Sequence, residues 1–164
     1  MNSDGSDQKQ ITQKEGGFPL FVSPDGKRIF YHHGRFRTLW STSFNGGDEQ
    51  LVLDKRKYDF GFSHDGLQVA FAENREDEKT LAVYSIAEQK IIKTFKLAGE
   101  NSQILEIEWM PDGKSVLYIL RENFENLGIW QQNVNEEMPK KIAGFDNEEI
   151  SEALGLSVSQ DGKG

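Results

Sequence analysis

The side chains best suited to recognition chemistry are arginines that recur along the chain. Arg35, Arg75 and Arg121 each follow an Asp-Gly pair by nine or ten residues, and Arg37 lies two residues beyond the first of them. The planar guanidinium fork of arginine suits carboxylate and phosphate groups. The spacing predicts a shared surface on which these four arginines bind a partner. The competing interpretation is that each arginine pairs with a neighbouring carboxylate, such as Glu122 beside Arg121, or packs on an adjacent repeat.

Motifs for covalent chemistry are missing from the sequence. Gly155-Leu156-Ser157-Val158-Ser159 lacks the closing glycine of a nucleophile elbow. Neither a glycine-rich phosphate loop nor a dinucleotide fingerprint occurs. The absence of cysteine excludes disulfides, thiolate metal sites and a cysteine nucleophile. We therefore expect a protein that is not an enzyme, with no catalytic residue and no cofactor.

The three histidines do not predict a metal site either. His32 and His33 are adjacent, and neighbouring residues of a strand point to opposite faces, so the pair cannot chelate one ion. No carboxylate stands nearby at a spacing typical of zinc sites. His64, the third histidine, lies in a turn. The sequence predicts no metal ligands.

The net charge of the chain excludes some classes of binding partner. The 164 residues carry 27 acidic and 19 basic side chains, a formal net charge of -8. This balance argues against nucleic acid and against an anionic membrane surface. No stretch approaches about 18 consecutive apolar residues, so no transmembrane helix is expected.

A repeated turn shows which elements must position these side chains. Its four copies have Asp-Gly pairs that fall 40, 47 and 49 residues apart. In two copies a proline precedes the Asp-Gly pair. Aspartate tolerates the next position of a turn and glycine accepts positive φ, so the motif is typical of a hairpin turn. The copies are Ser23-Pro24-Asp25-Gly26-Lys27, Ser63-His64-Asp65-Gly66, Met110-Pro111-Asp112-Gly113-Lys114 and Ser159-Gln160-Asp161-Gly162-Lys163.

Segments rich in β-branched and aromatic residues surround each turn, and each complete repeat predicts four short antiparallel strands. The third strand of each repeat carries an aromatic residue, Trp40, Tyr84 or Trp130, which we expect to pack between repeats rather than to stack on a ligand. Trp109 lies on a predicted inner strand and is expected in the core. Further strands are predicted at 8–12 and 153–159.

Four-stranded units at this period are typical of β-propeller blades. The Ser-Pro-Asp-Gly-Lys turn, the apolar strand after it and the Leu-Trp or Ile-Tyr strand resemble the TolB-like, WD-repeat-like β-propellers of bacteria. The resemblance implies an all-β fold with the end of one blade, three complete blades and the start of another. The corresponding ranges are 1–17, 18–53, 58–97, 104–143 and 153–164.

A propeller needs about four to eight blades to close. Three blades and two flanking strands therefore predict part of a propeller, which we expect to have six blades. The favoured interpretation is a segment of a longer chain. The alternative is a half-propeller that associates with another copy through its open blade edges.

The function expected from these features is a non-catalytic scaffold that binds a protein or peptide on its loop-bearing face. Two alternatives stay open. One is the gating propeller of a prolyl-oligopeptidase-type serine hydrolase, and the other is a propeller that binds a small ligand or carbohydrate. The compartment is open as well, with the bacterial periplasm favoured over the cytoplasm.

Overall fold

A computed structural model describes residues 4–12, 17–33, 38–54, 59–75, 78–99, 101–122, 126–146, 155–159 and 161–162. These residues contain twelve strands and no helix. Consequently, no helix in this part of the chain has the length and apolar character needed to cross a membrane. The all-β class expected from the repeats is confirmed.

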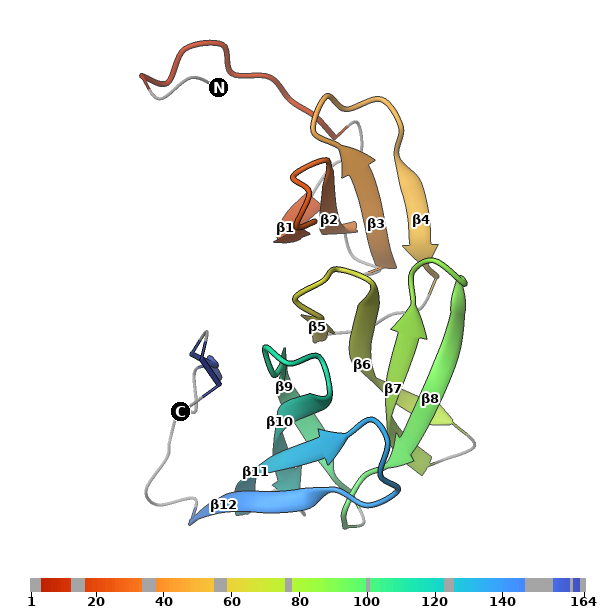
Figure 1. The fold of residues 1–164 in the computed structure, drawn as a ribbon, viewed down its shortest axis with the longest axis vertical. Helices are drawn as coiled ribbons and strands as arrows, with labels where there is room; N and C mark the ends of the chain where they lie inside the picture. Colours follow the sequence, from red (N-terminus) through yellow and green to blue (C-terminus); the bar gives the residue numbers. More distant parts are fainter. Residues whose placement is uncertain are drawn as a thin grey trace. The chain divides into compact units, whose positions relative to one another are not determined.

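The strands form three four-stranded antiparallel sheets, and in each sheet consecutive strands are neighbours (Figure 1). The first sheet belongs to a compact unit of residues 1–56, and the other two belong to a second unit of residues 57–164. The first sheet contains β1 (Gly17–Val22), β2 (Arg28–His33), β3 (Thr38–Ser43) and β4 (Gln50–Leu53). The second contains β5 (Phe60–Phe62), β6 (Gln68–Arg75), β7 (Glu78–Ser85) and β8 (Lys90–Lys96). The third contains β9 (Gln103–Trp109), β10 (Ser115–Glu122), β11 (Asn126–Asn133) and β12 (Lys140–Asp146).

Side-chain hydrogen bonds hold the Asp-Gly turns that open these sheets. In the β5–β6 turn, Ser63 Oγ donates to Asp65 Oδ1 over 2.6 Å and accepts from the backbone N–H of Gln68 over 2.9 Å. Gly66 has φ of 70°, which a residue with a side chain rarely adopts. The β1–β2 turn has the same serine–aspartate bond, whereas the β9–β10 turn has Met110 at the serine position and lacks it. Short local contacts therefore set where each hairpin closes.

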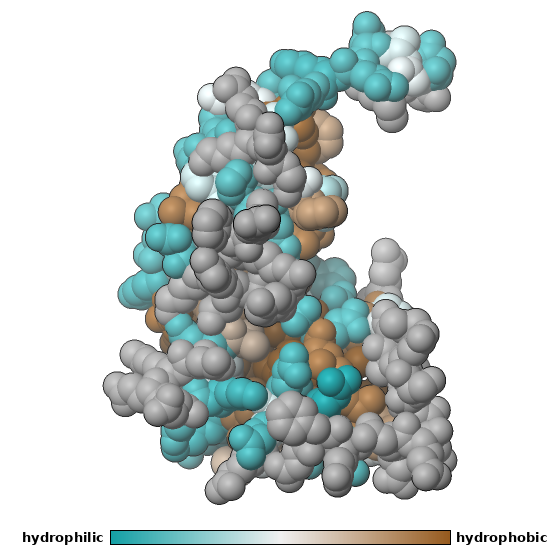
Figure 2. All heavy atoms as spheres, turned by 180° about the vertical axis from the view of Figure 1, so that it is seen from behind, coloured by the Kyte–Doolittle hydropathy of each residue, from teal (hydrophilic) through white to brown (hydrophobic). Residues whose placement is uncertain are grey.

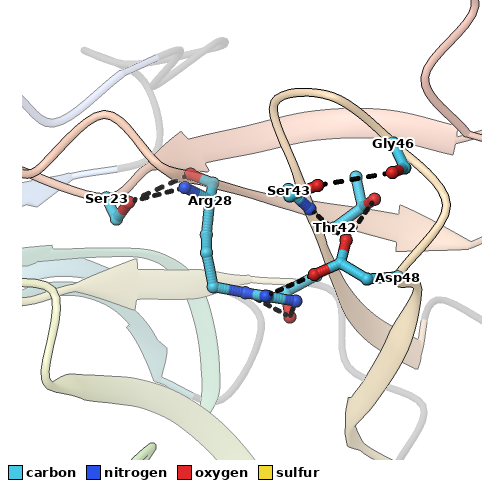
Figure 3. A network of polar contacts seen from close by, with 7 residues as sticks. Ser23, Arg28, Thr42, Ser43, Gly46 and Asp48 are labelled. Atoms are coloured by element: carbon cyan, nitrogen blue, oxygen red, sulfur yellow. Dashed lines mark hydrogen bonds and ion pairs between the residues drawn. The ribbon is translucent and has the colours of Figure 1, made fainter.

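A polar network fixes the turn between β3 and β4 in the first unit (Figure 3). Arg28 donates to Asp48 Oδ2 over 2.8 Å and to Ser41 Oγ over 2.9 Å. Asp48 Oδ1 accepts from the Ser43 backbone N–H and from Thr42 Oγ1. The bonds from Ser43, first of all its backbone N–H, and the Arg28 guanidinium lower the pKa of Asp48 to about 2.

The core of the second unit lies where its two sheets pack face to face. Trp109 is fully buried, as expected, and its indole N–H donates to the Gly61 carbonyl over 3.1 Å. A Cβ at position 61 would lie 2.7 Å from Ile107 Cγ2, so glycine lets β5 approach β9 closely. The cluster also contains Ala70, Leu81, Val83, Phe95, Ile104, Val116, Tyr118 and Leu120.

A β-bulge recurs beside the third-strand aromatic residue of every sheet. The pairing of the third and fourth strands shifts by one residue just before Trp40, Tyr84 and Trp130. In each case the fourth strand carries the extra residue, and these residues are Val52, Ile92 and Ile142. The three sheets thus share a register in addition to a strand order.

The flanking segments depart from the sequence prediction, because no ladder is assigned to residues 8–12 or to the described residues 155–159. The first segment instead contacts the β3–β4 turn, where Lys9 Nζ donates to the Asn45 carbonyl. In the second, the Leu156 N–H donates to Glu106 Oε2 over 2.7 Å. A strand requires a hydrogen-bonded neighbour, and the described residues provide none for either segment.

Candidate partner-binding face

The strand ends that flank three connections of the second unit approach one another, at the ends of the strands away from the Asp-Gly turns. These are the β6–β7, β8–β9 and β10–β11 connections. The Leu97 N–H donates to the Lys79 carbonyl, which joins the first two connections. A methyl group at Gly99 would lie 3.8 Å from Glu122 Cγ, so the second connection also approaches the third. We call this end of the unit the loop face.

The loop face contains a hollow of about 410 Å³. Its turn is held by Ser102, which is 2% exposed and whose hydroxyl donates to the Ala98 carbonyl over 2.5 Å. Asn101 has φ of 53°, a left-handed conformation that asparagine tolerates better than most residues. The hollow is lined by Glu78, Lys79, Lys96, Leu97, Gly99, Asn101 and Ser102.

One of the two lysines that line this hollow forms an ion pair with a lining glutamate. Lys96 Nζ lies 2.9 Å from Glu78 Oε1, and both side chains are mostly exposed. Within the described part of the chain, Lys79 forms no ion pair. An exposed ammonium beside an amide and backbone groups can bind a carboxylate or a backbone carbonyl of a partner.

The structure describes the predicted arginines to different extents. Arg121 is half-buried on β10, and its neighbour Glu122 is instead 3.4 Å from Lys141 Nζ. No carboxylate pairs with Arg121 among the residues described, so the predicted Arg121–Glu122 alternative is not observed. Arg75 ends β6, opposite Glu78 in the ladder. Arg35 and Arg37 lie outside the described residues.

Hairpin register separates Arg75 from Arg121. The turn bonds make Gln68 of β6 equivalent to Ser115 of β10. Counting along the two strands then places Arg75 at the position of Glu122, and Arg121 one position earlier. The two arginines therefore stand at strand positions that are not equivalent. A shared basic surface stays a prediction.

Other candidates have clear structural surroundings. His32 and His33 pair with consecutive residues of β3 and lie on opposite faces of the sheet, as predicted. The His33 ring lies 5.9 Å from that of Trp40. Tyr84 is only 6% exposed, in agreement with a packing role, whereas Trp130 is half-buried.

Inner-strand carboxylates were missed by the sequence prediction. Burial raises the pKa of Glu108 on β9, while the nearby His64 opposes this shift. Glu106 on the same strand accepts the Leu156 N–H. The alternation Leu105-Glu106-Ile107-Glu108 was the available signal, but polar residues on the outer side of a strand are ordinary.

Solved structures share this fold at low sequence identity. TolB from Agrobacterium tumefaciens, described as putative, aligns with a TM-score of 0.64 and 14% identity over 83% of this chain and 52% of its own. Dipeptidyl peptidase 4 from Porphyromonas gingivalis gives 0.62 and 14% over 85% and 27%. The β-propeller domain of the Trilobed protease from Pyrococcus furiosus gives 0.52 and 12% over 77% and 42%.

No family model and no curated protein sequence matches the chain. The chain spans between about a quarter and a half of the length of these solved structures. The likeness establishes the β-propeller fold, and the three sheets correspond to part of an open propeller.

Proposed function

We propose that the chain is part of a non-catalytic β-propeller scaffold that binds a protein or peptide through the loop face. The observation that carries this proposal is the hollow between the start of β7 and the β8–β9 connection. Its lining offers an ammonium group at Lys79, an amide at Asn101 and exposed backbone, which are groups that recognise peptides. Arg121 at the neighbouring hairpin would add a guanidinium group. Arg35, Arg37 and Arg75 would extend the same binding surface if the predicted arginine surface exists.

A peptide library displayed on phage tests this proposal with the whole chain as bait. We expect enrichment of peptides that bind the Lys79→Glu variant about tenfold more weakly than the unmodified chain. The reason is that the introduced carboxylate repels the peptide carboxylate or carbonyl that the Lys79 ammonium attracts. The matched control is Lys114→Glu, which makes the same charge change in the exposed β9–β10 turn at the opposite end. Equal binding by both variants, or no enrichment at all, contradicts the proposal.

A second candidate is the non-catalytic propeller of a serine peptidase, in which the propeller gates a hydrolase domain. The likeness to the propellers of two peptidases favours it. A Gly-x-Ser-x-Gly motif in a longer protein containing this chain would support the gate. Peptide hydrolysis by that longer protein, abolished when its motif serine is replaced, is the deciding measurement.

A further inference from the structure

The second unit has a groove of about 860 Å³ along its outer strands. Six consecutive residues, 93–98, line one side, and six more, 134–139, line the other. The first run belongs to β8 and its end, and the second to the turn between β11 and β12. The groove meets the loop-face hollow only at Lys96 and Leu97. We call it the rim groove.

Apolar side chains form the inner wall of the rim groove. Phe95 belongs to the core between the two sheets, and Leu97, Trp130 and Val134 pack against that core from the groove. Met138 lies on the lip and is 77% exposed. The groove is therefore a place where the inter-sheet core reaches solvent.

The charges of the rim groove are asymmetric. Ladder register places Lys93 on the same face of its sheet as Phe95, toward the other sheet. Lys93 has no ion pair within the described residues, and Lys141 Nζ lies 5.4 Å from the Trp130 ring centre. Glu136 and Glu137 are exposed on the opposite lip. The β8 wall thus offers the ammonium of Lys93, while the opposite lip carries the carboxylates of Glu136 and Glu137.

The length of the groove indicates what fits it. Six residues of extended chain span about 20 Å, so the groove matches a peptide segment better than a compact small molecule. We propose that the rim groove binds an extended acidic-apolar peptide segment of a partner protein. One apolar side chain packs between Phe95 and Met138, and an acidic residue beside it pairs with Lys93. Lysines on an edge strand discourage strand addition, so side chains rather than a new ladder hold the peptide.

Two pools of synthetic octapeptides test the proposal by fluorescence anisotropy on the whole chain. Each pool has a central Leu, Phe or Met, flanked by Asp in one pool and by Lys in the other. We expect the acidic pool to bind more tightly, and Lys93→Glu to weaken that binding at least tenfold. Met138→Ser is expected to weaken it as well, by several-fold, because it removes an apolar contact.

Matched controls make the result specific to the rim groove. Lys140→Glu carries the same charge change on β12, and Leu67→Ser removes an exposed apolar side chain from the β5–β6 turn. Both are expected to bind like the unmodified chain, as is Lys79→Glu of the loop face. Unchanged near-ultraviolet circular dichroism verifies that each variant folds. Equal binding of the two pools, no binding, or binding insensitive to Lys93→Glu overturns the inference.

Discussion

At the scale of single residues, polar side chains hold the turns of this fold through short hydrogen bonds. The Arg28–Asp48 pair is the clearest case, because Asp48 also accepts from the Ser43 N–H and Thr42 Oγ1. Three donors on one carboxylate favour its ionised form. Their effect is to tie the β3–β4 turn to the end of β3 and to the neighbouring strand β2.

Acid is expected to loosen this turn. Because folding lowers the pKa of Asp48 from 3.8 to about 2, the stabilisation is complete above the ordinary pKa and is lost as pH falls toward 2. We predict that the hydrogen-exchange protection of the Ser43 amide decreases between pH 4 and pH 2. Asp48→Asn is expected to give low protection across this range, whereas Asp54→Asn, at an exposed position of the same unit, leaves the profile unchanged. Constant protection in the unmodified chain contradicts this interpretation.

At the scale of strands and sheets, close approach of β5 to β9 determines how the second unit packs. The contact depends on Gly61, above which Ile107 lies and to whose carbonyl Trp109 donates. A side chain at this point has no room unless the two sheets separate. Separation would weaken the inter-sheet core and open the rim groove.

We predict that Gly61→Ala lowers the free energy of unfolding by about 1–3 kcal/mol, the usual cost of overpacking. Urea denaturation followed by tryptophan fluorescence measures the change, since Trp109 and Trp130 both belong to this unit. Gly155→Ala is the control, because a Cβ there meets nothing within 4 Å. Equal losses in both variants would mean that the β5–β9 approach is unimportant.

The parts of the fold that were predictable from sequence depend on local chemistry. Turns at Asp25, Asp65 and Asp112 use bonds between residues two apart, so their sequence is sufficient to identify them. The hollow at Asn101 requires the pairing of β7 with β8, and the groove beside Trp130 requires the packing of two sheets, and no local pattern encodes either. The arginine spacing already differs in the sequence, ten residues after Asp65 against nine after Asp112, and the ladder register gives the same one-position offset between Arg75 and Arg121.

At the scale of the whole molecule, apolar surface is left uncovered. Figure 2 shows apolar atoms at the surface among hydrophilic ones. On β1, Phe18 is 69% exposed and Val22 is 47% exposed. Inner propeller strands normally lie between neighbouring blades, so these side chains are available for association.

We predict that this chain self-associates through such surfaces at rising concentration. Light scattering is expected to give a mass above that of the monomer, because association removes apolar area from water. Phe18→Ser should lower the apparent mass, whereas Phe44→Ser, at a comparably exposed position in the β3–β4 turn, should not. A soluble monomer at every concentration refutes the prediction.

The bulges beside Trp40, Tyr84 and Trp130 have a consequence for how such a chain can evolve by duplication of blades. A single extra residue in an ordinary strand would reverse the inward and outward sides beyond it. Here the same extra residue occurs at the same place in each sheet, so a gene duplication that begins and ends at equivalent points copies a blade with its sidedness intact. Blades can therefore be gained or lost as whole units, while changes within a strand are penalised.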